Sequence, residues 1–378
     1  MTARIALMMP KDTAFYRQLA IQMGRGFQQE GWTVVTGYSL LTGAALIQFC
    51  EEFKPDVLFE MNRPRCDIPE LPLNIRHIAW IVDTNGRAND YFVGSEITYY
   101  WGANWFLSRP KSAYGFSAWL PPGVCSVDYR YGTQDKVCDF SYVGHMPQPW
   151  SQQEKDRIVS KGLLKIQFGE LLEDLERMLI KNNLRGFSND DYLAMAESLI
   201  GSLGAEIADL DDALRYDLGC RIVRQHTRQT ITSLALKSSS SVAFYGSKGW
   251  LAWPAYKAYY KGFLTQAKQL RDVYQTSRIN LHDGVGIHFR TMDCMGSGGL
   301  LFYLGSADDD AFGGMHTFFE PDKHFVRVDT ESFSDKADFY LRHPKLRQKI
   351  AQSASALVHA KHSWRQRAST VIKDLAAL

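Results

Sequence analysis

The segment RINLHDGVGIHFRTMDCMGSGGLLFYL, residues 278–304, decides the fold of this chain. It begins with the short stretch RINL at 278–281 and ends with the apolar stretch LLFYL at 300–304, and both predict strands. Between them lies a glycine-rich loop, followed by a stretch at 289–295 that predicts a helix. A strand, a helix and a second strand in this order are typical of a parallel βαβ unit, so the segment predicts an α/β fold.

The same alternation extends outward over two parts of the chain. In the first part, strands are predicted at 5–9, 33–38, 56–61, 75–82 and 97–101, and helices at 15–29 and 46–53. The pattern restarts with DFSYVG at 139–144, followed by strands at 242–245 and 325–328 and helices at 264–274, 334–341, 345–359 and from 363 onward. We therefore predict a doubly wound arrangement of two βα halves that join near residue 137.

The second half contains a long stretch of helical texture. Residues 151–236 hold no convincing strand, whereas leucine, methionine and isoleucine residues recur there at helical spacing. Such stripes are typical of helix faces that pack into a core. We therefore predict a helical insertion over about 151–236.

Composition excludes several classes of protein. The chain has 378 residues with 43 Lys and Arg against 41 Asp and Glu, and this balance argues against a dedicated nucleic-acid binder. The six cysteines show no C-x-x-C spacing, so no zinc or redox motif is predicted. The apolar run near the N-terminus is too short for a signal peptide, and no stretch approaches the ~18 apolar residues of a membrane helix. We therefore expect a cytoplasmic protein without a stable membrane span.

The glycine-rich loop has the chemistry of an anion site. A strand ends, glycines let the backbone approach a ligand, and a helix begins with its positive dipole end toward that ligand. Arg290 in the first turn could pair with a phosphate, and the Asp293 carboxylate could accept the hydroxyl groups of a ribose. His282 and His288 bracket the loop and could contact a phosphate or a sugar hydroxyl. The alternative interpretation is a turn followed by a solvated helix. Neither a GxxxxGK[ST] nor a GxGxxG motif is present.

Several further segments, taken in order, carry a family resemblance. They are WIVD at 80–83, LPPGV at 120–124, DFSYVG at 139–144, VAFYGSKGW at 242–250, DVYQTSRINLH at 272–282, RTMD at 290–293 leading to Gly298, and HSWRQR at 362–367. In this order the chain resembles glycosyltransferases of the CgeB (spore maturation protein) type, within the group-1 superfamily. The resemblance covers most of the chain except about 151–236.

The resemblance implies a GT-B fold, in which two Rossmann-like domains face a cleft. It implies an acceptor-side domain at 1–136, joined by a terminal helix at 364–378, and a nucleotide-sugar-binding domain at 137–363. The residues expected to bind the nucleotide sugar are Gly144, Gly246, Lys248, His282, His288, Arg290, Asp293, Gly298 and Gly299. The chain departs from the family at Asp293, where a glutamate is usual, and at Val285, where retaining relatives often carry a second glutamate. The stereochemical outcome of the transfer therefore stays open.

A general base is expected on the acceptor side, at the carboxyl end of a strand. Asp83 is the first choice because its position suggests partial desolvation, which would raise its pKa. Glu60 and Asp12 follow it as candidates, and a structural role is the alternative for each. The acidic run 308–310 suggests a metal site only weakly, so no metal or other cofactor is expected.

These observations predict a glycosyltransferase that moves a sugar from a nucleoside diphosphate to an unidentified acceptor, which the helical insertion helps to select. Two alternatives stay open. One is a scaffold of the same fold that binds nucleotides or sugars without catalysis. The other is a phage-type DNA-base glycosyltransferase, against which the balanced charge argues.

Overall fold

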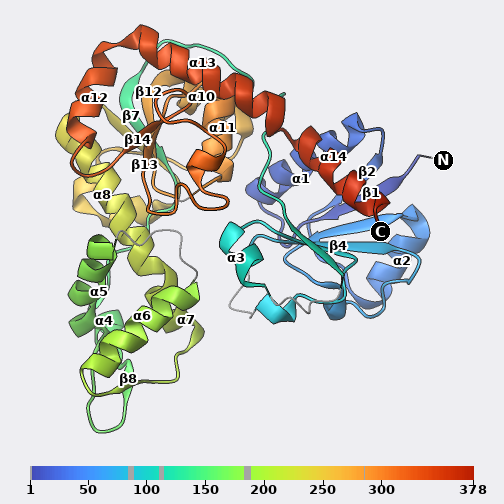
Figure 1. Ribbon diagram of the computed structural model, residues 1–378, viewed down its shortest axis with the longest axis horizontal. Coiled ribbons are helices and arrows are strands. Elements are labelled where there is room, and N and C mark those ends of the chain that lie inside the picture. Colours follow the sequence, from blue (N-terminus) through green and yellow to red (C-terminus); the bar gives the residue numbers. More distant parts are fainter. Residues whose placement is uncertain (1, 84–88, 110–114, 183–188, 285) are drawn as a thin grey trace.

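The computed structural model describes residues 2–83, 89–109, 115–182, 189–284 and 286–378 (Figure 1). Strands in these residues form two six-stranded sheets and one two-stranded sheet. Both large sheets are parallel throughout, so the predicted α/β fold is confirmed. No helix in the described ranges is long and apolar enough to cross a bilayer.

The first sheet has the strand order β2-β1-β3-β4-β5-β6. Its strands are β1 (Arg4–Met8), β2 (Thr33–Gly37), β3 (Val57–Met61), β4 (Arg76–Ile81), β5 (Ile97–Tyr100) and β6 (Phe116–Trp119). The helices of this part are α1 (Ala14–Gln29), α2 (Gly43–Phe53) and α3 (Ala103–Ser108). Side chains alternate between the two faces: Ile5 and Leu7 pack with α1, whereas Ala6 and Met8 pack with α2. This sheet is therefore covered by helices on both faces.

The second sheet has the order β11-β10-β7-β12-β13-β14. Its strands are β7 (Cys138–Val143), β10 (Val242–Tyr245), β11 (Tyr260–Gly262), β12 (Ser277–His282), β13 (Leu301–Leu304) and β14 (Val326–Val328). The accompanying helices are α8 (Ile222–Ser238), α9 (Pro254–Lys257), α10 (Ala267–Thr276), α11 (Phe289–Ser297), α12 (Phe333–Arg342) and α13 (Pro344–Lys361). The segment quoted first forms β12, α11 and β13, as predicted.

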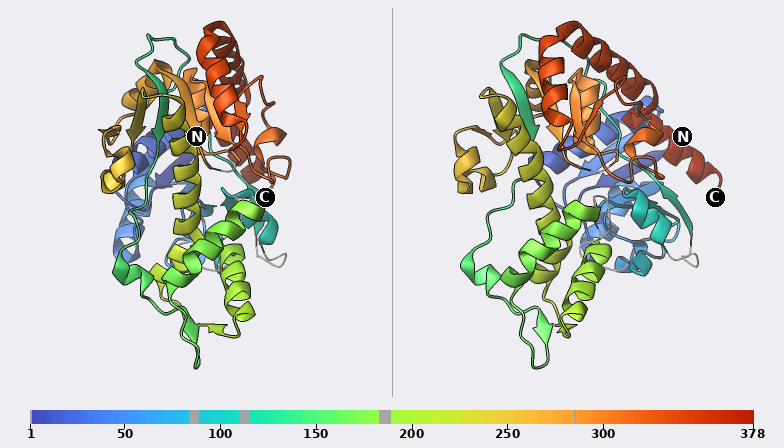
Figure 2. Two further views of the ribbon diagram at one scale, coloured as in Figure 1. Left: turned by 90° about the vertical axis from the view of Figure 1, so that its left-hand side faces the viewer. Right: turned by 60° about the vertical axis from the view of Figure 1, so that its left-hand side comes forward.

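The predicted insertion is a separate helical layer with its own apolar core, which includes Val159, Phe168, Leu171 and Leu218. It contains α4 (Gln152–Lys155), α5 (Phe168–Asn182), α6 (Asn189–Ser202), α7 (Asp212–Tyr216) and the π-helical turn η3 (Asp217–Arg221). The expectation of a segment without strands was wrong, because β8 (Ser160–Lys161) pairs antiparallel with β9 (Glu206–Ile207). Each strand has only two residues, too few for a periodic sequence signal. Figures 1 and 2 show this layer extending away from both large sheets.

The last helix, α14 (Trp364–Ala376), packs against α1 and so returns the chain to the first sheet (Figure 1). Trp364 lies 5.8 Å from Trp80 between ring centroids, and the Tyr99 hydroxyl donates to Asp374 at 2.6 Å. Gly26 is required at this contact, because a Cβ there would lie 2.5 Å from the Trp364 carbonyl oxygen. Both ends of the described chain therefore belong to the first sheet.

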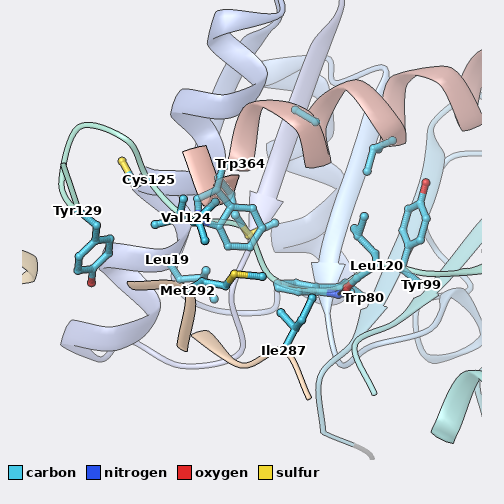
Figure 3. Packing of buried hydrophobic residues seen from close by; sticks show 14 of the residues in the cluster. Leu19, Trp80, Tyr99, Leu120, Val124, Cys125, Tyr129, Ile287, Met292 and Trp364 are labelled. Atoms are coloured by element: carbon cyan, nitrogen blue, oxygen red, sulfur yellow. Dashed lines mark hydrogen bonds between the residues drawn. The ribbon is translucent and has the colours of Figure 1, made fainter. Parts of the chain in front are cut away.

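One apolar cluster joins the two large sheets. It combines Leu19 and Trp80 of the first part with Met292 of α11 and with Trp364 (Figure 3). Val124, in the connection between the sheets, lies in the same cluster and forms an isolated bridge with Ser363. The two halves of the molecule thus share part of their core.

Candidate active site

A cavity of about 330 Å³ lies between the carboxyl edges of the two large sheets. Its lining is Trp101, Gly102, Ala103, Asn104, Trp105, Trp119, Gly219, Cys220, Val223, Arg224, Thr227, Arg228, Asp283, Gly284, Gly286, Ile287, His288, Arg290, Asp308, Ala311, Phe312, Gly313 and Gly314. Ligands of doubly wound sheets bind outside the carboxyl ends of their strands, which is where this cavity lies. It is therefore the candidate active site.

The wall that the second sheet contributes is organised by Asp283, which directly follows β12 and is 6% exposed. Its carboxylate accepts hydrogen bonds from the Tyr142 hydroxyl at 2.6 Å and from Thr227 at 2.8 Å. It also forms an ion pair with Arg228 at 3.3 Å. Burial alone would raise the pKa of Asp283, but Arg228, His282 and Arg290 outweigh it and hold that pKa well below its usual range. Asp283 is therefore an ionised group that fixes Arg228 at the cavity.

Arg290 enters the cavity from the first turn of α11. Its Nη1 donates to the Val143 carbonyl at 2.7 Å, which aims the guanidinium across the end of β7. A Cβ at Gly144 would stand 2.2 Å from this nitrogen, so the glycine leaves the space that the guanidinium occupies. Arg224 lines the same cavity from α8, with the Tyr216 hydroxyl as its hydrogen-bond partner at 3.1 Å. Arg224 and Arg290 thus face the cavity, and neither forms a direct ion pair with a carboxylate of the described residues.

His288 caps α11, because its Nδ1 accepts from the backbone N–H of Arg290 at 3.1 Å. Burial, and then Arg290 and His282, lower the pKa of His288 well below its usual value. A neutral imidazole whose Nδ1 accepts carries its proton on Nε2, so His288 is a hydrogen-bond donor at the cavity. His282 lies behind it, 2% exposed, with a ring-centroid distance of 5.3 Å. Its pKa is lowered to about 3, and its buried Nε2 has no hydrogen-bond partner among the described residues.

The opposite wall is aromatic and comes largely from the first sheet. Trp101 follows β5, Trp105 lies in α3 and Trp119 ends β6. The Trp119 Nε1 donates to the Trp101 carbonyl at 2.9 Å, and its ring lies 5.1 Å from that of Phe312. The cavity therefore has one cationic wall and one aromatic wall.

The three predicted bases occupy different environments. Asp83 lies at the end of β4 and is exposed, so the desolvation expected for it is absent. Cys220 lines the cavity. Burial raises the pKa of its thiol, and the charge of Asp83 raises that pKa further. Asp83 itself is not among the residues that line the cavity.

Glu60 and Asp12 lie in environments that do not favour the role of a base. Glu60 has no exposed surface and is bound by Arg63 and by His77, the latter at 3.2 Å, so its carboxylate cannot reach an acceptor. Asp12 is exposed and paired with Arg17, outside the residues that line the cavity. A strand-terminal position alone did not distinguish these carboxylates from Asp83.

Other predicted nucleotide-sugar residues also lie away from the cavity. Gly298 and Gly299 stand at the opposite end of α11 from Arg290, where Gly298 adopts φ 84° to end the helix. Asp293 is partly buried near Tyr129 and Asp128, which belong to the connection between the sheets. Burial raises the pKa of Asp293 well above its usual value. The structure thus places these residues at helix ends and packing contacts rather than in the cavity lining.

Gly246 and Lys248 also lie outside the cavity lining. Gly246 allows a close backbone approach, since a Cβ there would lie 2.1 Å from the Gly144 carbonyl oxygen. Lys248 is exposed at the start of a 3₁₀ turn. Val285, at which the family departure was noted, lies outside the described residues.

The acidic run 308–310 does not converge on one point. Asp309 is buried and binds Tyr303 at 2.9 Å and Arg327 at 3.1 Å, whereas Asp310 faces His316. Within the described residues, no group of three or more His, Cys, Asp or Glu side chains could hold a metal ion.

Sequence reasoning missed Asp283, Arg224, Arg228 and the tryptophan wall. A signal existed for Asp283, which lies in the quoted segment directly after the predicted strand. The others come from distant parts of the chain, and only the fold brings them together.

The comparisons with known proteins agree with this geometry. Residues 224–373 match a family model described as glycosyl transferase-like. No curated protein is similar enough in sequence to count as a relative.

Several solved structures share the fold. The sucrose-phosphate synthase of Thermosynechococcus elongatus has a TM-score of 0.52 at 10% identity, over 99% of both chains. A glycosyltransferase from Rickettsia africae ESF-5 has a TM-score of 0.51 at 9% identity, over 99% of this chain and 98% of that one. AviGT4, a glycosyltransferase involved in avilamycin A biosynthesis, has a TM-score of 0.50 at 11% identity, over 98% of this chain and 96% of that one. At such identities the likeness concerns the fold.

Residues 224–373 therefore match a glycosyl transferase-like domain, and the chain as a whole shares the GT-B fold of the solved structures above. The GT-B prediction is therefore confirmed.

Proposed function

We propose that this glycosyltransferase binds a nucleoside diphosphate sugar at the cationic wall of the cavity and transfers the sugar to an acceptor at the aromatic wall. The observation that carries the proposal is the difference between the two walls. Arg224, Arg228 and Arg290 come from the second half of the chain, whereas Trp101 and Trp119 come from the first. The negatively charged leaving group would bind at the cationic wall, and the neutral acceptor would pack against the aromatic wall.

On the donor side, Arg224 and Arg290 supply positive charge that is not directly paired with a carboxylate of the described residues. Arg290 is held by a backbone carbonyl, so its remaining N–H groups are available to a diphosphate. The N-terminus of α11, next to His288, adds the positive end of the helix dipole. As the glycosidic bond breaks, these groups stabilise the negative charge that develops on the diphosphate. Asp283 is a positioning residue in this scheme, because it acts through Arg228.

On the acceptor side, Asp83 is the proposed general base. It is exposed shortly after β4, and its charge acts on Cys220, which lines the cavity; both observations support this assignment. A carboxylate at this position could accept the proton of an attacking hydroxyl group. The aromatic wall would pack against the apolar face of the acceptor, and η3 of the helical insertion lines the same cavity through Gly219 and Cys220.

Four narrower assignments belong to the same proposal. The first is the CgeB type as the subfamily, and the second is a domain boundary between residues 136 and 137, with the terminal helix assigned to the first domain. The third is a reaction without a metal cofactor, and the fourth is the cytoplasm as the compartment. The motif order in the second half supports the first of these, and the gap between β6 and β7 supports the second.

Isothermal calorimetry with UDP and GDP tests the donor site. Arg290→Ala should weaken diphosphate binding roughly ten- to a hundredfold, as expected for a lost charge-assisted hydrogen bond worth roughly 1.5 to 3 kcal/mol. Arg342→Ala is the matched control, because Arg342 is exposed on α12 and pairs with Asp338 away from the cavity. Equal affinity of the Arg290 variant and the wild type would contradict the donor site.

Product analysis then separates the alternatives. Hydrolysis or transfer of the sugar from a UDP- or GDP-sugar supports the enzyme, whereas diphosphate binding without either reaction supports the inactive scaffold. Salt-dependent binding of duplex DNA would instead favour the DNA-base glycosyltransferase.

A further inference from the structure

The far end of the helical insertion is a β-hairpin with an apolar tip, residues 157–168. Leu163 is fully exposed and Leu164 is 48% exposed, in a region where neighbouring leucines such as Leu171 are buried. Figure 1 and both views of Figure 2 show this hairpin, next to the β8 label in Figure 1, protruding at the extremity of the molecule. Two adjacent leucines at a convex tip are costly in water and suggest a surface that becomes covered.

The hairpin is a defined element and not a loose loop. The Ser160 hydroxyl donates to the Leu164 carbonyl at 2.8 Å and accepts from the Ile166 N–H at 2.7 Å. The Val159 N–H donates to the Ile166 carbonyl at 3.0 Å, and Gly162 supplies the left-handed turn with φ 92°. These hydrogen bonds fix the base of the hairpin, and the Leu164 carbonyl at the tip is bonded within it.

The charges around the two leucines are cationic. Lys161 and Lys165 flank the pair and are exposed. Among the described residues, the carboxylate paired with either lysine is that of Glu206, which lies 4.0 Å from Lys161 and is itself 82% exposed. Such an exposed pair is easily exchanged for another anion. Aliphatic side chains bracketed by lysines match a surface that has an apolar interior beneath anionic groups.

We propose that this tip docks on an anionic lipid surface, with Leu163 and Leu164 entering the headgroup region and Lys161 and Lys165 contacting lipid phosphates. A protein partner would need a complementary pocket for a convex tip, whereas a bilayer accepts it without one. The hairpin is braced against the cavity wall, because Arg157 at its base pairs with Asp217 of η3 at 2.5 Å. Docking would therefore hold the cavity at a fixed distance from the lipid surface.

Vesicle co-sedimentation of the full chain tests this inference independently of any sugar transfer. The probes are vesicles of phosphatidylserine and phosphatidylcholine in equal parts, and vesicles of phosphatidylcholine alone. The wild type should bind the anionic vesicles, with affinity that falls as salt is raised. Leu163→Ser with Leu164→Ser should weaken this binding by a factor on the order of a hundred, and Lys161→Gln with Lys165→Gln by about tenfold or more.

Leu73→Ser is the matched control, since Leu73 is 94% exposed in the first half of the chain, far from the hairpin. It should bind as the wild type does. All variants should keep the thermal stability of the wild type, because the replaced side chains are exposed. Absence of wild-type binding, or equal binding by the double leucine variant, would overturn the proposal. Equal binding to both kinds of vesicle would overturn the anionic part of it.

Discussion

The guanidinium of Arg290 occupies the space that a side chain at residue 144 would need. A Cβ at Gly144 would lie 2.2 Å from Arg290 Nη1, well inside van der Waals contact. Gly144 directly follows β7, and Arg290 lies in the first turn of α11, more than a hundred residues later in the chain. The glycine and the arginine therefore act as one unit at the cationic wall of the cavity.

Gly144→Ala should displace the Arg290 guanidinium and weaken UDP or GDP binding about as much as Arg290→Ala does, roughly ten- to a hundredfold. The reason is steric, because the new methyl group takes the place of Nη1. Calorimetry measures the affinity. In an Arg290→Ala background, Gly144→Ala should have little further effect, and additive losses would contradict the coupling.

Asp293→Asn should raise the free energy of unfolding at neutral pH and leave donor affinity unchanged. Burial raises the pKa of Asp293 in the folded state, so folding favours its neutral form. Its contribution to stability is complete below the unfolded pKa of 3.8 and is lost as the pH rises through the folded value. Asparagine does not ionise, so the variant does not lose stability in this way as the pH rises. The difference in the free energy of unfolding between the variant and the wild type should therefore disappear in acid. Chemical denaturation at several pH values measures it, and a fall in donor affinity would return Asp293 to the binding site.

Asp83→Asn should reduce turnover by roughly 10²- to 10⁴-fold, the usual effect of losing a general base, with donor affinity unchanged. Asp12→Asn is the matched control, because Asp12 is an exposed carboxylate of the same half that pairs with Arg17 away from the cavity. Steady-state kinetics with a UDP- or GDP-sugar measures the effect. Full turnover in the Asp83 variant, or an NMR spectrum showing a retained anomer, would remove the need for this base.

Stability should fall as the pH drops below 6.5, because two buried histidines resist protonation. Burial and Arg290 lower the pKa of His282 to about 3, and burial and Arg367 lower that of His362 to about 4. Unfolding lets each ring bind a proton, so each contributes a loss of about 1.4 kcal/mol per pH unit between 6.5 and its folded value. Denaturation curves for wild type, His282→Asn and His362→Asn test this. Each variant should show a shallower dependence, and unchanged slopes would contradict it.

Most strands of both sheets could be predicted, because parallel strands buried on both faces are mainly apolar runs, as in VLFEM of β3, but the three-residue edge strand β11 was missed. β6 was missed because FSAW lies at a sheet edge, where none of its residues is fully buried. α3 was missed because it has six residues and no side-chain cap. Local sequence therefore predicts buried elements better than short or exposed ones.

The candidate site could be predicted only in part. Arg290 and His288 follow from the loop-to-helix logic of one segment, and both line the cavity. That logic did not distinguish the two ends of α11, so Gly298 was assigned to the same site although it ends the helix. The tryptophan wall depends on the register of β5 and β6 beside the second sheet, which a linear pattern does not contain.

The return of α14 to the first sheet has a consequence for how the chain folds during synthesis. Trp364 belongs to the same apolar cluster as Trp80 and Leu19, yet it is translated after the whole second sheet. A nascent chain that has completed β1 to β6 would still expose the surface of α1 that α14 later covers. The first half can begin to fold early but can complete its packing only after residue 376 has left the ribosome, so that side of α1 must stay soluble while the second half is being made.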